Sequence, residues 1–213
     1  MAERKIKLFL AIESFLYVVF LSLDLIGQYQ ASIGWKYAGI LLCCFFSLSY
    51  QNKDKLVPAA LTLTALADLF LLVLDQYYIF GLLLFFFVQM IYAVRLHQLK
   101  SPYFTVARIL SPVFVFTILY AAGFINSINL LAALYFTQLI LNTISAWAGR
   151  KNTLFAIGLT LFACCDICVG AYNVPSLVPT ALYEACYIGM WLFYLPSQVL
   201  ITLSSIKPYI SLS

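Results

Sequence analysis

The sequence has 213 residues, of which 64% are hydrophobic and only 9% are charged, and its mean hydropathy is +0.99. Because a soluble domain carries about 25% charged residues, this chain lacks the polar side chains to cover a water-facing surface. The formal net charge of +4 comes from basic residues scattered over short loops, which argues against nucleic acid as a partner. The composition predicts one integral membrane domain, residues 1–213.

Eight apolar runs are each long enough to cross the hydrocarbon layer, which takes about 20 residues of helix. Helices are required there because the bilayer offers no partners to backbone polar groups. The short connections predict that consecutive helices are antiparallel neighbours. The expected fold class is all-α, a polytopic membrane bundle of eight transmembrane helices. The predicted spans are residues 6–26, 33–51, 56–74, 77–98, 103–123, 127–148, 152–172 and 182–206.

Basic residues gather in the predicted loops on one side of the membrane. Lys36 is the only basic residue in the predicted loops on the other side. Lys and Arg accumulate on the cytoplasmic side of membrane proteins. Both termini are therefore predicted to be cytoplasmic, and in a bacterium the membrane would be the plasma (inner) membrane. The basic residues of the predicted cytoplasmic side are Arg4, Lys5, Lys7, Lys53, Lys55, Arg95, Lys100, Arg150, Lys151 and Lys207.

Two carboxylates interrupt apolar runs, Asp68 in the third span and Asp166 in the seventh. A charge near the bilayer centre costs roughly 2.5 kcal/mol or more, so two such placements indicate a function. At a rise of 1.5 Å per residue, Asp68 lies ~18 Å and Asp166 ~21 Å from the predicted cytoplasmic ends of their helices. The two side chains are therefore expected at similar depth. Bonding between helices, without a catalytic role, is the alternative.

The two halves of the chain resemble each other. Gln89 follows Asp68 by 21 residues and Gln198 follows Asp166 by 32, and a longer loop at 173–180 accounts for the difference. Four helices per half would give both halves the same orientation, which is a pair of parallel four-helix repeats. Chance similarity between apolar helices remains the alternative.

Polar residues recur at helical spacing in several spans, and residues three, four and seven apart share a helix face. Thr64, Asp68 and Asp75 are expected on one face of the third span. Such faces turn inward in a membrane bundle, so a polar chamber rimmed by aromatic rings is predicted. For the amides, hydrogen bonds between helices are the alternative, and Arg108 either reaches the cytoplasmic surface or binds an anionic headgroup. The predicted binding residues are Gln89, Tyr92, Gln138, Asn142, Tyr194, Gln198 and Arg108.

Metal-ligating residues are sparse. His97 is the single histidine, which excludes a zinc centre built on several histidines. The six cysteines all lie in apolar spans, where small, weakly polar residues are common at helix contacts. Neither a metal nor another cofactor is expected. The cysteines are Cys43, Cys44, Cys164, Cys165, Cys168 and Cys186.

The spans around the two aspartates resemble the YhhN-like family, whose characterised members are lysoplasmalogenases. The resemblance is carried by four short stretches and covers most of the chain by topology. Both aspartates and the last glutamine match the family pattern, whereas Ala67 replaces a glycine, Gln89 a histidine and Cys165 a serine. The four stretches are Ala67-Asp68-Leu69-Phe70-Leu71-Leu72, Gly81 to Tyr92, Cys165-Asp166 and Tyr194-Leu195-Pro196-Ser197-Gln198.

The resemblance implies hydrolysis of the vinyl ether bond of a lysoplasmalogen, with a lysophospholipid-like substrate. Such a bond reacts by protonation at carbon and capture of the resulting oxocarbenium ion by water. One of Asp68 and Asp166 would donate the proton, and the other would stabilise the cation and activate water; the sequence leaves open which is which. Gln89, Gln198 and Tyr194 would position the water and the glycerol oxygens. The alternatives are a proton-coupled small-solute transporter and a non-catalytic lipid-binding member of the family.

Overall fold

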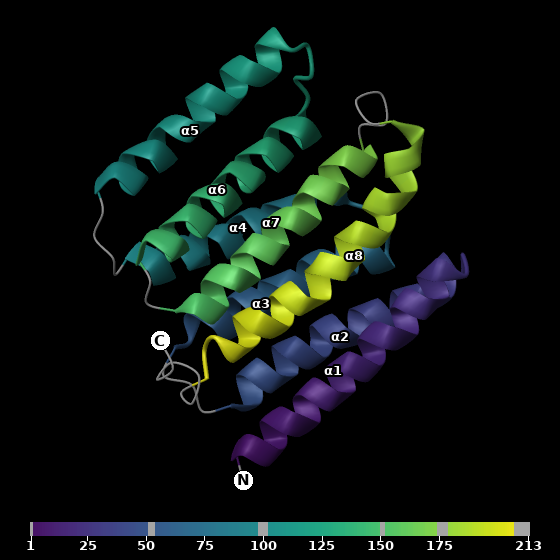
Figure 1. Cartoon of the computed structure of the whole chain (residues 1–213). Helices are drawn as coiled ribbons and strands as arrows, with labels where there is room; N and C mark the ends of the chain where they lie inside the picture. Colours follow the sequence, from purple (N-terminus) through teal and green to yellow (C-terminus); the bar gives the residue numbers. More distant parts are fainter. Residues whose placement is uncertain (1, 51–53, 98–101, 150–151, 174–178, 207–213) are drawn as a thin grey trace.

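The computed structural model describes residues 2–50, 54–97, 102–149, 152–173 and 179–206 (Figure 1). Within them eight helices are long and apolar enough to cross a membrane, and no strand occurs. This confirms the predicted fold class. The predicted loop residues Lys53, Lys100, Arg150, Lys151 and Lys207 lie outside the described ranges. The elements are α1 (Ala2–Leu25), α2 (Tyr29–Ser49), α3 (Leu56–Asp68), the π-helix η1 (Leu69–Val73), α4 (Tyr78–His97), α5 (Pro102–Ala121), α6 (Ser127–Gly149), α7 (Thr153–Asn173) and α8 (Thr180–Leu203).

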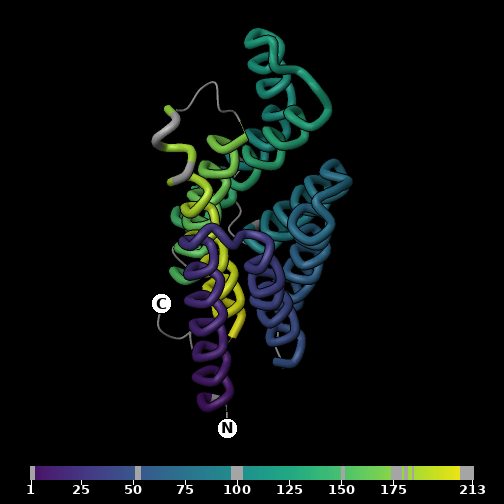
Figure 2. The backbone as a smooth tube through the Cα atoms, turned by 90° about the vertical axis from the view of Figure 1, so that its right-hand side faces the viewer, coloured from purple at the N-terminus to yellow at the C-terminus, as the bar shows by residue number. Residues whose placement is uncertain are grey.

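The packing of the first four helices is repeated by the last four. α1 packs on α2, α2 on α3 and α3 on α4; likewise α5 packs on α6, α6 on α7 and α7 on α8. Two of the contacts between the halves are equivalent by this repeat: α4 packs on α6 as α8 packs on α2. α8 also contacts α1 and α3. In Figure 1, α1 and α5 run in the same direction, and Figure 2 shows α8 beside α1 and α2. This is the arrangement expected of two parallel four-helix repeats.

The helix α5 departs from the expectation that consecutive helices are neighbours. α5 packs chiefly on α6 and barely on α4 (Figure 1), whereas α4 packs on α3 and α6. The α4–α6 contact is fixed by Asn142, whose amide Nδ2 donates to the carbonyl oxygen and to Oε1 of Gln89, both at 2.9 Å. The prediction that α4 and α5 are neighbours is therefore wrong, because α6 lies beside α4 in the place expected for α5.

The assignment of Lys36 to a loop is also wrong. Lys36 lies inside α2, and its side chain is 1% exposed. Its ammonium contacts Asp24 Oδ1 at 3.0 Å and Oδ2 at 2.9 Å, and it lies 4.5 Å from the ring centroid of Trp191. Ser32 Oγ donates to the same carboxylate at 2.6 Å. A buried ion pair, rather than a loop, therefore explains this isolated basic residue.

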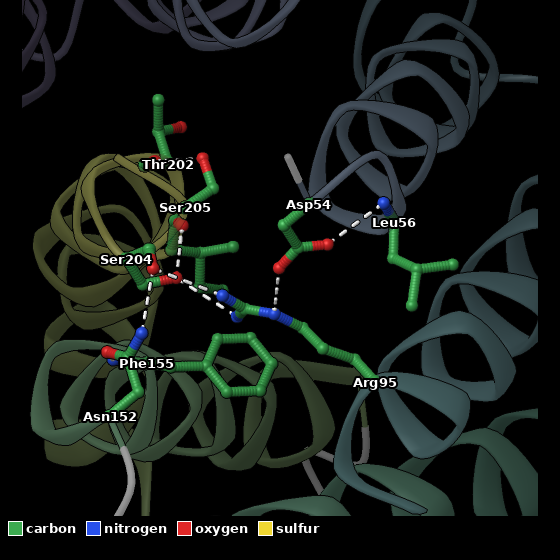
Figure 3. Close-up of polar contacts among 9 residues, drawn as sticks. Asp54, Leu56, Arg95, Asn152, Phe155, Thr202, Ser204 and Ser205 are labelled. Carbon is green, nitrogen blue, oxygen red and sulfur yellow. Dashed lines mark hydrogen bonds and ion pairs between the residues drawn. The ribbon is translucent and has the colours of Figure 1, made fainter. Parts of the chain in front are cut away.

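A cluster around Arg95 joins four helices at the end of the bundle where α3 and α7 begin (Figure 3). Arg95 Nε donates to Asp54 Oδ2 at 2.6 Å, and its Nη1 and Nη2 donate to the hydroxyl and carbonyl oxygens of Ser204 at 3.0 and 3.1 Å. Asn152 Nδ2 donates to the same carbonyl at 2.7 Å. The guanidinium also lies 4.1 Å from the centroid of Phe155. These contacts fix the ends of α3, α4, α7 and α8 relative to one another.

The third span changes helix type directly after Asp68. The chain continues as the π-helix Leu69–Val73, and π-turns of this kind are frequent at functional sites. The helical span ends at Val73, so Asp75 lies in the connection to α4 rather than on a helix face. Asp75 is exposed, with a φ of 49°, and accepts a hydrogen bond of 2.6 Å from Tyr78. The prediction that Asp75 shares a face with Thr64 and Asp68 is therefore wrong.

Candidate active site

Each of the two intramembrane aspartates is held by a tyrosine hydroxyl from another helix. Tyr194 of α8 donates to Asp68 Oδ2 at 2.6 Å. Tyr135 of α6 donates to Asp166 Oδ2. Asp68 is 4% exposed, whereas Asp166 is half-buried. Each half of the bundle therefore supplies one carboxyl group, and the two differ in their access to the surroundings.

The two tyrosine–aspartate pairs lie on either side of one phenylalanine. The ring centroid of Phe162 is 5.5 Å from that of Tyr194 and 6.5 Å from that of Tyr135. Because both tyrosines contact Phe162, the two tyrosine–aspartate pairs lie in the same region of the bundle. The structure thus brings the two predicted acids together in the interior of the bundle, rather than on opposite faces.

Tyr135 was not among the predicted site residues, although a repeated spacing points to it. Tyr135 precedes Asp166 by 31 residues, and Tyr37 precedes Asp68 by the same interval. Tyr37 does lie near Asp68, but its hydroxyl donates to the carbonyl oxygen of Ala65 at 3.3 Å. The spacing would have identified a tyrosine beside each aspartate, whereas only the structure shows which tyrosine bonds the carboxyl group.

A second polar group lies between α5, α6 and α4 and contains four of the predicted binding residues. Arg108 Nη1 donates to Gln138 Oε1 at 2.9 Å, and its Nη2 donates to Asn142 Oδ1 at 2.7 Å. Asn142 in turn donates to Gln89 Oε1, so the network extends to α4. Gln138 Nε2 donates to Ser111 Oγ at 2.9 Å. Arg108 therefore points into the protein, so the prediction that it reaches the cytoplasmic surface is wrong.

A proline explains how α5 accommodates this network. Pro112 lies inside α5 and has no N–H to donate to the carbonyl of Arg108, four residues earlier. Ser111 Oγ donates to that carbonyl instead, at 2.9 Å. Pro196 in α8 has the same consequence at Leu192, whose carbonyl accepts the hydroxyl of Tyr17 at 2.9 Å. Both prolines are thus built into intact helices, with side chains replacing the missing donors.

The comparison with known families decides the membership of the chain. The model of the YhhN family matches residues 31–205, which is most of the sequence. The chain belongs to the YhhN family. Comparisons with curated proteins and with solved structures found no match. The YhhN family includes lysoplasmalogenases, and the matched range contains both aspartates and both of their tyrosine partners.

The three positions at which this YhhN-family protein departs from the family pattern are all buried. Ala67 and Gln89 are 0% exposed, and Cys165 is 5% exposed. Ala67 and Cys165 each precede one of the aspartates, so both lie beside the candidate acids. Gln89 lies instead in the network of Arg108, where its Oε1 accepts from Asn142.

Several buried polar atoms of this YhhN-family protein have no hydrogen-bond partner among the described residues. Four of them belong to amide or hydroxyl side chains: Gln89 Nε2, Gln198 Oε1, Tyr92 Oη and Thr64 Oγ1. Tyr92 packs its ring edge-on to Phe155 at 5.3 Å, so the ring is fixed while the hydroxyl is unpaired. Buried polar groups normally find partners in protein or water. The polar chamber stays a prediction, and these groups are what would face water or substrate in it.

Two further carboxylates of the YhhN-family bundle, Asp24 and Glu13, have hydrogen-bond partners outside the candidate site. Asp24 is neutralised by Lys36, as described above. Glu13 is 3% exposed and accepts a hydrogen bond from Cys43 Sγ at 3.3 Å. All six cysteines are free thiols. Among the residues that the structure describes, no three His, Cys, Asp or Glu side chains gather as a metal site.

Proposed function

We propose that this YhhN-family protein is a membrane-embedded hydrolase that cleaves the vinyl ether bond of a lysoplasmalogen, releasing a fatty aldehyde and a glycerophospho-headgroup. The observation that carries the proposal is the pairing of Asp68 and Asp166, supplied by separate halves and each held by a tyrosine. Family membership supplies the substrate class, since the YhhN family includes lysoplasmalogenases. The lipid would come from the membrane itself.

The chemistry of a vinyl ether fits two carboxyl groups with different tasks. An acid adds a proton to the alkene carbon farther from the ether oxygen, and the remaining positive charge spreads over the nearer alkene carbon and the ether oxygen. Water then forms a bond to that carbon and loses a proton to a base. The resulting hemiacetal breaks its bond to the glycerol oxygen, which takes up a proton, and the aldehyde leaves. One water is consumed, and general acid–base catalysis typically contributes 10²- to 10⁴-fold.

The burial of the two carboxyl groups suggests which one is the acid. Asp68 is almost completely enclosed, and keeping a charge there would cost more than keeping a proton. Asp166 is less enclosed, which leaves more room beside it for a water molecule or the substrate. We therefore assign proton donation to Asp68, with Asp166 as the carboxylate that stabilises the cation and activates water. Two carboxyl groups close together hold one proton between them more readily than none or two.

The tyrosines and the unpaired amides have supporting tasks in this proposal. Tyr194 and Tyr135 each donate to one oxygen of a carboxyl group, which leaves the other oxygen to face the substrate. Gln198 Oε1 can accept a hydrogen bond from water or a glycerol hydroxyl, and Tyr92 Oη can donate or accept one. We place both termini in the cytoplasm, as the basic residues predict, so the lipid would come from the cytoplasmic leaflet.

The test is aldehyde release by the purified protein in lipid nanodiscs. Vinyl-ether lysophospholipid should yield fatty aldehyde detected by mass spectrometry, whereas the saturated-ether analogue should yield none. In D₂O the aldehyde should carry one deuterium on the carbon next to the carbonyl, because that carbon takes up the proton. Asp68→Asn and Asp166→Asn should each lower turnover about 10²-fold or more. Asp75→Asn is the matched control, because Asp75 is exposed on the same span.

The outcomes separate the proposal from its competitors. Full activity of Asp68→Asn would remove the acid role. Saturable lipid binding without any turnover would identify a non-catalytic lipid-binding protein, which is favoured by Gln89, since an amide cannot carry a proton at neutral pH. Solute uptake into proteoliposomes driven by a proton gradient, without aldehyde release, would identify a transporter.

A further inference from the structure

We propose that Arg108, together with Gln138, Asn142 and Gln89, forms a binding site for the phosphate of a lysophospholipid. The proposal depends on the proposed function for the identity of the lipid, but it concerns binding rather than cleavage. It would make the presence of a phosphate, not the acyl chain alone, the feature by which this protein selects its lipid.

The charge of Arg108 has no acidic neighbour to balance it. The three helices that build the network, α4, α5 and α6, contain no Asp or Glu. The ion pairs found among the described residues involve Lys7, Lys36 and Arg95, and none involves Arg108. Amide oxygens accept hydrogen bonds but do not neutralise a cation. A half-buried guanidinium within a membrane span therefore favours an anion supplied from outside the chain.

The network also leaves donors free for such an anion. A guanidinium has five N–H groups, and Arg108 donates one from Nη1 and one from Nη2. Nε and the second hydrogens of both Nη atoms donate to no described residue. Gln89 is 0% exposed, and its Nε2 likewise lacks an acceptor while its Oε1 is occupied by Asn142. The free groups of the network are thus N–H donors, which suits phosphate oxygens.

The depth of the network matches the distance along a lysophospholipid. Gln138 lies three residues after Tyr135 on α6, so a rise of ~4.5 Å along the helix separates the partner of Arg108 from the partner of Asp166. In a lysoplasmalogen, a three-carbon glycerol separates the phosphate from the vinyl ether. A phosphate at Arg108 would therefore direct the ether linkage towards the two carboxyl groups.

The arrangement of α5 leaves this network within reach of the lipid. α5 is covered almost only by α6, and most of its side chains are exposed. The equivalent helix of the first half, α1, packs on both α2 and α8. Where the first helix of each half packs on the second, the first half has the acidic Glu13 and the second half has the cationic Arg108. An anionic headgroup would therefore favour the second half.

The test is lipid binding measured by native mass spectrometry on the purified, full-length protein in detergent. The probe is a saturated 1-alkyl lysophospholipid, which carries the phosphate but cannot be cleaved as a vinyl ether, and the reference is the 1-alkyl glycerol that lacks the phosphate. Arg108→Gln should weaken binding of the lysophospholipid about 10- to 100-fold, as expected for loss of hydrogen bonds from a charged group. Binding of the alkyl glycerol should be unchanged, which also shows that the variant is folded.

Two control variants sharpen the result. Lys7→Gln removes a charge from an exposed residue of α1 and should leave both affinities unchanged. Arg108→Lys keeps the charge but cannot reach two amides as a fork, so it should retain part of the affinity. If Arg108→Gln does not fold, Arg108→Lys in the same two-lipid comparison decides the matter: an unchanged preference for the phosphate lipid would overturn the proposal.

Three results would contradict the site. Equal losses for both lipids after Arg108→Gln would mean that Arg108 supports packing rather than phosphate. Equally strong binding of a two-chain phospholipid would indicate a structural lipid, and displacement of the lysophospholipid by millimolar inorganic phosphate would indicate a general anion site. Failure of the proposed hydrolysis would leave all these binding results unaffected, so the two proposals can fail separately.

Discussion

Removing one partner of the buried ion pair between Lys36 and Asp24 should destabilise the bundle strongly. Both side chains are essentially unexposed, the ammonium contacts both carboxylate oxygens, and Ser32 bonds the same carboxylate. Replacing Lys36 with Met leaves Asp24 as an uncompensated buried charge, which typically costs about 3–5 kcal/mol. The contact of the ammonium with Trp191, worth about 0.5–2 kcal/mol, is lost as well.

The assay is reversible unfolding in mixed micelles, followed by the fluorescence of the three tryptophans. Lys36→Met and Asp24→Asn should each reduce the free energy of unfolding, the former by about 3–5 kcal/mol. The double variant should lie much closer to the wild type than the sum of the two, because no unpaired charge remains. A loss below about 1 kcal/mol for Lys36→Met, or strict additivity in the double variant, would refute this reasoning.

Two other predictions concern the contacts between helices, and both use the same unfolding assay. Arg95→Gln should lower the free energy of unfolding by about 2–4 kcal/mol, because three hydrogen bonds from a charged group are lost; no loss would mean that the cluster in Figure 3 is not a clamp. Gly158→Ala should cost about 1–3 kcal/mol, since its Cβ would lie 2.9 Å from Ile201 Cγ1. Gly170→Ala on the same helix meets nothing within 4 Å and should be neutral or slightly stabilising, so equal effects of the two would contradict the packing argument.

Much of the fold could be predicted because lipid restricts the possibilities. Length and apolarity alone define membrane spans, and backbone polar groups must be satisfied within each span. The eight helices follow from this restriction. The place of α5 does not, because it depends on the hydrogen bonds between Asn142 and Gln89, and a pair of amides on different helices leaves no periodic pattern.

The candidate site was partly predictable for a similar reason. A carboxylate within an apolar run can be recognised from the sequence of its own helix alone. Asp68 and Asp166 could therefore each be identified, and their similar depth followed from the helix rise. Their tyrosine partners depend on rotation and packing of other helices. The π-helix after Asp68 is likewise invisible to a pattern based on 3.6 residues per turn, and the end of the span at Val73 explains why Asp75 does not share a face with Asp68.

The two halves share a plan but not their chemistry, and the proposed function needs that difference. In a perfectly symmetric bundle the two aspartates would have the same surroundings, and nothing would decide which one carries the proton. Here Asp68 is enclosed and receives its hydrogen bond from α8, whereas Asp166 is half-buried and receives its bond from α6. Different partners at equivalent positions therefore give one carboxyl group the surroundings of an acid and the other those of a carboxylate. The acidic Glu13 on α1 and the cationic Arg108 on α5 show the same divergence between the two halves.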